Sequence, residues 1–476
     1  MSPPPEAIPM PPARPIVGNL FDLDMKGPTQ SMARLAREYG PIYRLRLPAM
    51  DMVVVTDPKL TAELGDEELF PKCVHGSLVP LKDIVGDGLF TAETDSHAWQ
   101  KGHRILRGLF SMSAVQSYHA TMVEITEEML DHWQSRMDEE IVVTTDITKL
   151  AVDIIFKSCA GQRLSDFGSA AYHPLIDAIA YCFQTATNRS VRPAFVNKLI
   201  GFFQTTYKKN REYIFSYVDN VIDERLRLKD GIPDDMLTLL LNTPDPETGE
   251  KFTPKEIRDQ LLTLLLAGHE TTKGVLSFGL NELAQSKEAY AKLRDEVVAV
   301  AGSDFRKPPT YEAIAKMKYL DNTVKELVRL WPTVMIYAVR PVRRHLLAGR
   351  WPVDPSQNVV VLLEGLHQDR EFWGADAGEF RPERWETPRI RTEAKYAYQP
   401  WGRGKRSCTG RLFATHELKV ALAMILQRFD FTTNKTSRDI ERDETLSITP
   451  KDLRIKVRLR EEPAAVLIRN PKTVSN

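Results

Sequence analysis

The segment WGRGKRSCTG (residues 401–410) places a cysteine among glycines and cationic side chains. The chain contains only four cysteines, which lie far apart at positions 73, 159, 182 and 408. Cysteines so few and so scattered do not form a disulfide framework, and they favour a reducing compartment. The setting of Cys408 therefore indicates a chemical role for this particular thiol.

Three common kinds of site fit this segment poorly. A phosphate-binding loop requires a third glycine or the pattern G-x-x-x-x-G-K-[ST], and an apolar strand leading into it. A nucleic-acid surface requires aromatic side chains interleaved with the cations. A structural zinc site requires about four ligands, usually in local pairs, whereas Cys408 has no second cysteine nearby.

A single thiolate ligand fits the segment better. We expect a helix to begin near Gly410, so that the sulfur of Cys408 lies beside free backbone N–H groups, which favour an anion. Neighbouring cations also lower the pKa of a thiol. Arg406 is placed to meet a carboxylate on the group that the sulfur binds. A haem satisfies both requirements, because its iron accepts a thiolate and its propionates are anionic.

The segment resembles the cysteine-ligand loop of the cytochrome P-450 family, whose pattern is F-x-x-G-x-R-x-C-x-G. The matching positions are Trp401, Gly404, Arg406, Cys408 and Gly410. Tryptophan stands where the family usually has phenylalanine, and its indole N–H would weaken the thiolate if it donated to the sulfur. Simple packing is an equally good interpretation of Trp401.

Other motifs at the family spacing support this resemblance. They are KELVRL with Glu326 and Arg329, FRPERW with Arg384, AGHETT, and WQKGH. The similarity covers essentially the whole chain and is greatest to the haem domain of self-sufficient fatty-acid hydroxylases. Shorter stretches shared with those proteins are DPETGE, GDGLFT, LWPT and ETLSITP.

The resemblance implies a mainly helical protein with small β-sheets, the cytochrome P-450 fold, in one haem domain over residues 1–476. Hydrophobic periodicity gives the same picture. It predicts a strand pair over 41–57 and mostly helices over 97–300. A central buried helix begins at Thr253-Pro254, and another helix runs from Tyr311 until Pro332 stops it. The remaining expected elements are strands over 338–364, a helix over about 410–428 and short strands over 445–460.

The resemblance also assigns roles to individual residues. Cys408 is the axial ligand of the haem iron, and Thr271 with Glu270 handles protons during oxygen activation. The other interpretation of Thr271 is structural, because a helical threonine often bonds the carbonyl of the preceding turn. Glu326, Arg329 and Arg384 form a buried triad that holds the cysteine loop. The expected haem contacts are Arg406, Trp99, His103, Lys72, Trp401, Gly402, Gly410 and Ala267.

A lipophilic substrate is expected above the haem. The apolar positions that match substrate contacts of the fatty-acid hydroxylases are Leu78, Leu81, Ile84, Val85, Phe90, Ala267, Val334, Met335 and Leu446. Those hydroxylases hold a carboxylate with Arg and Tyr on the second strand, where this chain has Met50 and Val54. The expected lid over the entrance contains Tyr181, Phe183, Phe195, Phe202 and Phe203.

Charge and hydropathy limit the partners. Lys plus Arg and Asp plus Glu both total 64, so the net charge selects no polyanion such as nucleic acid. The proline-rich residues 1–20 lack the apolar core of a signal peptide or anchor. No later stretch approaches the roughly 18 apolar residues of a membrane span. We therefore expect a cytoplasmic protein without a membrane anchor.

The sequence thus predicts a monooxygenase that hydroxylates C–H bonds of a fatty acid or related long-chain compound. It would use O2, haem b, and electrons from NADPH through an FAD/FMN reductase outside this chain. A basic face of Arg403, Lys405, Arg411, Lys101 and Arg104 is expected to bind that reductase. Two alternatives remain: a peroxide-driven peroxygenase or hydroperoxide isomerase, which the pair Glu270-Thr271 disfavours, and a non-catalytic haem-thiolate sensor.

Overall fold

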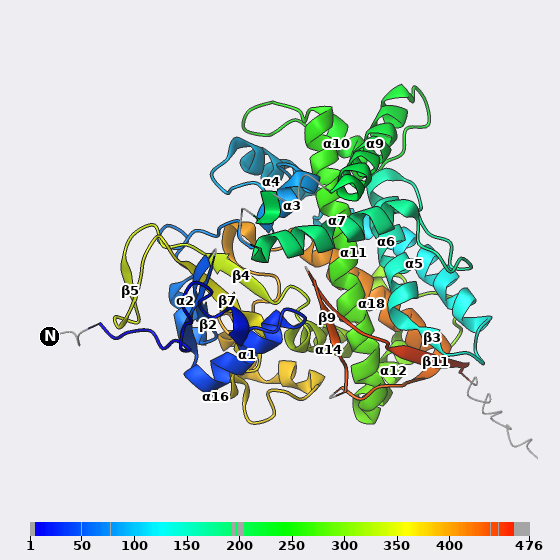
Figure 1. Ribbon diagram of the computed structural model, residues 1–476. Coiled ribbons are helices and arrows are strands. Elements are labelled where there is room, and N and C mark those ends of the chain that lie inside the picture. Colours follow the sequence, from blue (N-terminus) through cyan, green and yellow to red (C-terminus); the bar gives the residue numbers. More distant parts are fainter. Residues whose placement is uncertain are drawn as a thin grey trace, which may run out of the picture.

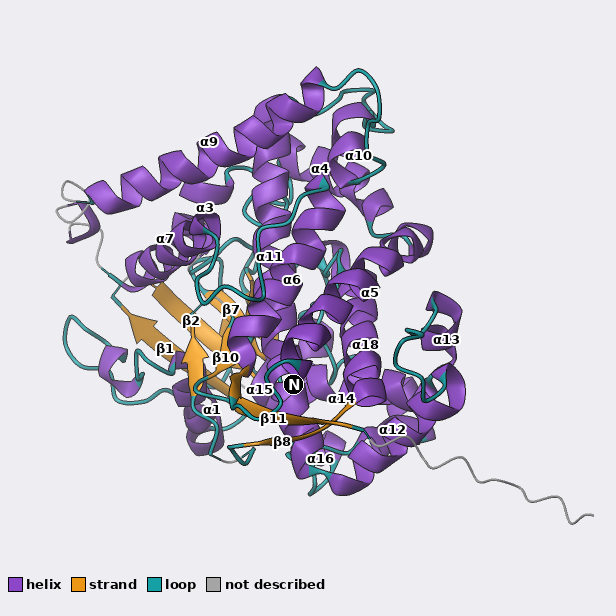
Figure 2. Ribbon diagram, turned by 90° about the vertical axis from the view of Figure 1, so that its right-hand side faces the viewer, coloured by secondary structure: helices purple, strands orange, loops and turns teal. Residues whose placement is uncertain are grey.

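The fold is dominated by helices, and the strands gather mainly on one side of the molecule (Figures 1 and 2). The computed structural model describes residues 5–48, 50–76, 78–192, 196–198, 204–437, 439–445 and 447–460. The order of helices and strands confirms the expected mainly helical class with small sheets. Three short 3-10 helices also occur: η1 (Leu20–Asp22), η2 (Pro382–Glu386) and η3 (Gly404–Arg406). None of the described helices has the length and apolarity needed to cross a membrane.

The helices have the following bounds: α1 (Pro28–Tyr39), α2 (Pro58–Glu63), α3 (Leu78–Val85), α4 (His97–Leu109), α5 (Met112–Gln134), α6 (Val143–Ala160), α7 (Pro174–Val191), α9 (Thr205–Arg227), α10 (Met236–Asn242), α11 (Pro254–Gln285), α12 (Lys287–Ala301), α13 (Tyr311–Lys316), α14 (Lys318–Leu330), α15 (Leu363–His367), α16 (Arg370–Trp373), α17 (Pro388–Glu393) and α18 (Arg411–Arg428).

The strands are β1 (Ile42–Leu47), β2 (Met50–Val55), β3 (Ile141–Val142), β4 (Ile336–Val339), β5 (His345–Leu347), β6 (Trp351–Val353), β7 (Asn358–Leu362), β8 (Phe429–Thr433), β9 (Arg442–Glu444), β10 (Ile448–Pro450) and β11 (Arg454–Leu459).

Helix α11 runs through the middle of the helical part (Figure 1). Its start was correctly predicted: the Thr253 hydroxyl accepts the N–H of Glu256, the Glu256 carboxylate accepts the N–H of Thr253, and Pro254 occupies the first turn. This reciprocal cap satisfies N–H groups that the helix cannot pair internally. Most of the apolar middle of α11 is buried, as expected for a central helix.

The largest described sheet has four strands in the order β1-β2-β7-β4. The hairpin of β1 and β2 confirms the predicted strand pair, and β2 continues the sheet through parallel pairing with β7. The valines of β2 and β7 are fully buried because apolar clusters pack on both faces of the sheet. Such continuous apolar strands are typical of a sheet covered on both sides.

Two predicted boundaries were wrong. The helix expected from Tyr311 to Pro332 is two helices, because the chain becomes extended at Met317. The Glu296 carboxylate accepts the N–H groups of Tyr319 and Leu320 and so caps the second helix, α14. The apolar run NVVVLLEGL forms strand β7 only to Leu362 and then turns into α15.

Helix α11 also contacts the C-terminal helix and the last strands. Thr272 Oγ1 lies 3.4 Å from Glu417 Oε2 on α18, in the buried interior. At Gly274 a Cβ would lie only 2.4 Å from the carbonyl oxygen of Ile448, so glycine permits β10 to approach the helix. These contacts fix the helix that carries AGHETT relative to the helix that follows the cysteine loop.

Candidate functional site

The cysteine loop closes through its own backbone. The Cys408 N–H donates to the Trp401 carbonyl at 2.8 Å, and the Gly402 N–H donates to the Gln399 carbonyl at 3.0 Å. Gly402 has a φ of +67°, and a Cβ there would lie 2.7 Å from Lys72 Nζ. The left-handed backbone favours glycine at this position. Helix α18 starts at Arg411, close to the predicted position.

The thiol of Cys408 keeps accessible surface although protein atoms crowd around it. Removal from water raises the pKa of this thiol, while a hydrogen bond from the Gly410 N–H and the charges of Arg411 and Lys72 lower it. The net direction is upward, so the prediction of a lowered pKa was wrong for the protein without a bound group. The N–H groups and cations that would favour a thiolate are nevertheless in place.

Four side chains predicted to hold the propionates form one continuous group. Lys72 Nζ donates to the Arg406 carbonyl at 3.3 Å, and the Arg406 guanidinium lies 5.5 Å from the centre of the Trp99 ring. Trp99 in turn stacks on His103 with ring centres 4.7 Å apart. Residues from three distant parts of the chain are thus brought together beside the cysteine loop.

Lys72 and Arg406 make no direct ion pair in the described parts of the chain, and the carboxylates of Glu67 and Glu93 act on them only from a longer distance. Arg406 donates only to neutral oxygens, among them the carbonyls of Ala92 at 2.5 Å and Phe90 at 3.1 Å. Lys72 likewise makes no ion pair with a described residue. Burial lowers the pKa of Arg406, and burial together with the charge of Arg406 lowers the pKa of Lys72 to about 8. Partly buried cations without a counter-ion are costly unless an anionic group binds there.

This arrangement fits a haem. The Cys408 thiol at the start of a helix would ligate the haem iron, and Lys72 and Arg406 would supply charges for the propionates. Ala267 is exposed on α11 although Leu264, Leu265 and Leu266 just before it are buried, as expected for a residue beside a planar group. Trp401 is partly buried against the core, and no described hydrogen bond joins its indole N–H to the sulfur.

The polar residues of AGHETT are all engaged. The Thr271 hydroxyl donates to the Ala267 carbonyl at 2.8 Å, which is the structural bond expected of a helical threonine. The hydroxyl oxygen keeps lone pairs that can accept a hydrogen bond. The Glu270 carboxylate is 2.9 Å from Lys273 Nζ and 3.0 Å from His269 Nε2. Burial raises the pKa of Glu270, but Lys273 and His269 outweigh it and hold the pKa well below its usual range.

The predicted triad is a fully buried network centred on the Glu326 carboxylate. Arg329 Nε and Nη2 each donate to it at 2.8 Å, and Arg384 Nε donates at 3.3 Å. The Trp385 indole N–H at 3.0 Å and the Arg381 backbone N–H at 3.1 Å complete its partners. Glu326 and Arg329 are 0% exposed, so protein groups rather than water compensate their charges.

A histidine that the sequence interpretation missed joins the triad to the cysteine loop. His367 Nδ1 is 3.0 Å from the Arg329 carbonyl, and His367 Nε2 accepts the Gln399 N–H at 2.9 Å. The Gln399 carbonyl accepts the N–H of Gly402. Burial lowers the pKa of His367 to about 3, which keeps the ring neutral with one donor and one acceptor nitrogen. No motif marked His367, because its function is evident only from these contacts.

The apolar positions expected around the substrate differ in exposure. Leu81, Ile84, Val85 and Met335 are buried in apolar clusters. The positions that keep accessible surface are Leu78, Phe90, Ala267 and Val334. Leu446 lies outside the described residues. Met50 and Val54, which stand where the fatty-acid hydroxylases have Arg and Tyr, are both apolar residues of β2. Met50 is half-buried, and Val54 is fully buried in an apolar cluster on one face of the sheet.

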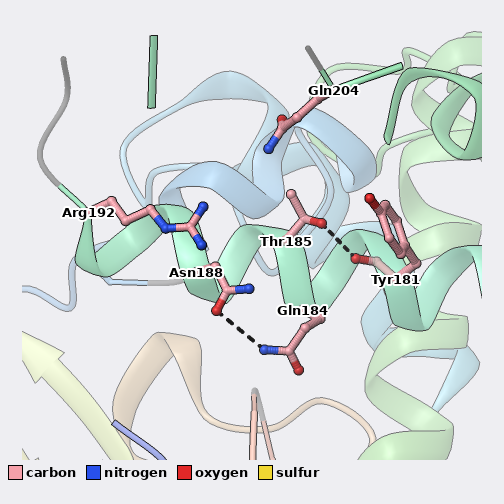
Figure 3. A pocket seen from close by; sticks show the side chains of 6 residues that line it. All are labelled: Tyr181, Gln184, Thr185, Asn188, Arg192 and Gln204. Atoms are coloured by element: carbon pink, nitrogen blue, oxygen red, sulfur yellow. Dashed lines mark hydrogen bonds between the residues drawn. The ribbon is translucent and has the colours of Figure 1, made fainter. Parts of the chain in front are cut away.

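A pocket of about 240 Å³ lies on one face of α7, within the region expected to form the lid (Figure 3). Phe183 points to the other face of the helix and is buried in the core. Tyr181 and Phe183 therefore do not form one aromatic lid surface, and Phe195, Phe202 and Phe203 lie outside the described residues. The pocket is lined by Tyr181, Gln184, Thr185, Asn188, Arg192 and Gln204.

The basic face expected for a reductase is smaller than predicted. Lys101 is buried and pairs with Glu256 at 3.1 Å, and Arg104 pairs with Asp245 at 2.6 Å. Sequence spacing could not show these ion pairs, whose acidic partners lie more than a hundred residues away. The cations of that face that remain at least partly accessible are Arg403, Lys405 and Arg411.

Comparison with known proteins finds similarity over nearly the whole chain. A model of the family Cytochrome P450 matches residues 8–457. A bifunctional cytochrome P450/NADPH–P450 reductase of Bacillus cereus is 34% identical over 96% of this chain and 42% of its own length. A protein of the same description from Bacillus subtilis is 36% identical over 96% of this chain and 43% of its own length. A self-sufficient cytochrome P450 monooxygenase of Penicillium expansum is 34% identical over 97% and 44%. The chain thus spans less than half the length of these relatives.

Proposed function

The chain belongs to the cytochrome P450 family, and on that premise we propose that it is the haem domain of a monooxygenase. The observation that carries the proposal is Cys408 at the start of α18 beside the cations Lys72 and Arg406, which make no ion pair with a described residue. A haem bound there through the thiolate supplies the activation of O2 for insertion into a C–H bond. The protein's own residues hold this group, exclude water and manage protons.

Each polar group has a place in this proposal. Lys72, Arg406 and His103 hold the propionates, and Trp99 packs between Arg406 and His103. Thr271 accepts a hydrogen bond on the side of the haem where the substrate is expected, since its own hydrogen is already donated to Ala267. Glu270 is the nearby carboxylate through which protons reach Thr271.

The substrate is a lipophilic molecule. Leu78, Phe90 and Val334 offer apolar surface, and Met50 and Val54 provide no cation for a carboxylate. We therefore propose a long-chain compound held mainly by apolar contacts, with fatty acids as one candidate class. Electrons come from NADPH through an FAD/FMN reductase, because the bifunctional relatives carry that partner in their names. A cytoplasmic location agrees with this partner.

The experiment compares the haem-loaded chain with its Cys408→Ser variant in the reduced, carbon monoxide-bound state. We expect the absorption band typical of thiolate-ligated haem in the unchanged protein and its loss in the variant. A retained band in Cys408→Ser would refute the ligand assignment. A reductase domain with NADPH should then support hydroxylation of long-chain alcohols or acids without added peroxide. Product formed only with peroxide would favour a peroxygenase, and no product under either condition would favour a sensor.

A further inference from the structure

We propose that Lys273 is a positioning residue: it keeps the Glu270 carboxylate ionised and fixed against Ser447, where the carboxylate can take up a proton and pass it toward Thr271. This inference rests on the proposed role of Glu270 in proton transfer. Lys273 follows AGHETT directly in the sequence, one turn after Glu270. None of the roles assigned above uses it.

The Glu270 carboxylate has no free acceptor position. Lys273 Nζ lies 2.9 Å from both oxygens. His269 Nε2 contacts Oε1 at 3.0 Å, and the Ser447 hydroxyl contacts Oε2 at 3.2 Å. A carboxylate offers about four acceptor positions, and these four contacts use them. Glu270 can therefore take up a proton and pass it to Thr271 only if one of these partners is released.

His269 is the second partner of the carboxylate. Its Nδ1 lies 2.8 Å from the Leu265 carbonyl, which only accepts, so Nδ1 carries a hydrogen. Its Nε2 lies 3.0 Å from Glu270 Oε1. Of the two partners, Lys273 is the one that brings an ammonium group to both carboxylate oxygens.

The elements packed around Glu270 bring no competing charge to it within the described residues. The group of the C-terminal segment that reaches the carboxylate is the hydroxyl of Ser447, which carries no charge. On α6, which packs against α11, Asp153 pairs with Arg163 and Lys157 pairs with Glu124. The charge state of Glu270 is therefore set by Lys273 and His269 against burial.

Replacing Lys273 by methionine keeps the apolar stem and removes the charge. The carboxylate stays buried, so its pKa should rise by about one to three units, the usual effect of one adjacent opposite charge. Infrared difference titration of the haem-loaded protein measures this directly through the carbonyl stretch of the protonated carboxyl, and Glu270→Gln identifies the band. Lys273→Arg should restore the unchanged titration. Lys255→Met is the matched control, because it removes an ion pair with Asp259 at the other end of the same helix.

The second measurement is product formed per NADPH consumed between about pH 6 and 8, with the reductase domain of a bifunctional relative as electron source. For Lys273→Met we expect lower coupling than for the unchanged protein and Lys273→Arg throughout this pH range, because the carboxylate is no longer held against Ser447. An unshifted carboxyl band in Lys273→Met would overturn the proposal, as would a fall in coupling of equal size in Lys255→Met. Unchanged coupling in Glu270→Gln would instead refute the proton-transfer role of Glu270, and the infrared shift would still decide the effect of Lys273 on its ionisation.

Discussion

Replacement of Glu326 by alanine tests whether the buried network holds the cysteine loop. The substitution removes the acceptor of five hydrogen bonds, two of them from Arg329. Arg384 keeps a second carboxylate partner, Asp376, at 3.1 Å, but Arg329 is left with backbone carbonyls only. The main cost is therefore one guanidinium with 0% exposure and no counter-ion.

Breaking a buried pair by removing one partner costs about 3–5 kcal/mol. This loss is a large part of the roughly 5–15 kcal/mol that stabilises an ordinary folded domain. It corresponds to about two to nearly four orders of magnitude in the folding equilibrium. Because His367 connects the Arg329 carbonyl to Gln399, the loop that presents Cys408 should be displaced before the whole protein unfolds.

The assay is the ratio of haem absorbance to protein absorbance after purification, together with urea unfolding. We expect Glu326→Ala to carry little or no haem and to unfold at clearly lower urea. The control is Glu288→Ala, whose partner Lys292 lies four residues later and whose side chain is 81% exposed, so its loss should cost less than about 0.5 kcal/mol. Equal haem content and equal stability in Glu326→Ala and Glu288→Ala would refute the reasoning.

Two further predictions follow from charge. Burial holds the pKa of His367 near 3, below the value of about 6.5 in an unfolded chain. The contribution of the neutral ring to stability is therefore complete above about pH 6.5 and is lost as pH falls toward 3. Urea midpoints measured across this range should fall less steeply in His367→Gln than in the unchanged protein, and parallel curves would contradict this. Reduction by an NADPH-dependent reductase should slow as salt increases, because screening weakens attraction between exposed charges. The dependence of the reduction rate on salt should be smaller in Lys405→Gln but unchanged in Lys208→Gln on α9. Equal salt dependence in both variants would exclude Lys405 from the contact.

Local sequence signals were sufficient for most of the fold. The pair Thr253-Pro254 marked the start of α11, and the alternation over 43–47 with the apolar run after it marked the hairpin. The break at Met317 could not be predicted, because the group that caps α14 is Glu296, which belongs to a different helix. Periodicity detects an apolar face, but a helix boundary set by a distant side chain leaves no local pattern.

The residues of the site likewise divide into those that sequence motifs identify and those that only the structure reveals. The motifs located Cys408, Thr271 and the triad, since each motif is a short run of fixed positions. The role of His367 depends on contacts between distant segments. The spacing of Glu270 and Lys273 is that of an i,i+3 helical pair, but the burial of that pair and its contact with Ser447 become evident only in the structure. The same reason explains the error over Lys101, whose charge is neutralised by residues that sequence proximity does not identify.

The balance of charge connects the cofactor site to stability. Lys72 and Arg406 are partly removed from water without a direct ion pair in the described chain, so the protein alone bears an electrostatic cost beside the cysteine loop. An anionic group that binds there removes this cost and acquires the charge-assisted hydrogen bonds. Any group that binds the folded state alone stabilises it in proportion to the logarithm of its concentration over its dissociation constant. Lys72→Met should therefore lower the stability gained on haem binding more than it lowers the stability of the haem-free protein. An equal loss in both forms would show that Lys72 acts through packing on Tyr337, 4.8 Å from its ammonium group, rather than through charge.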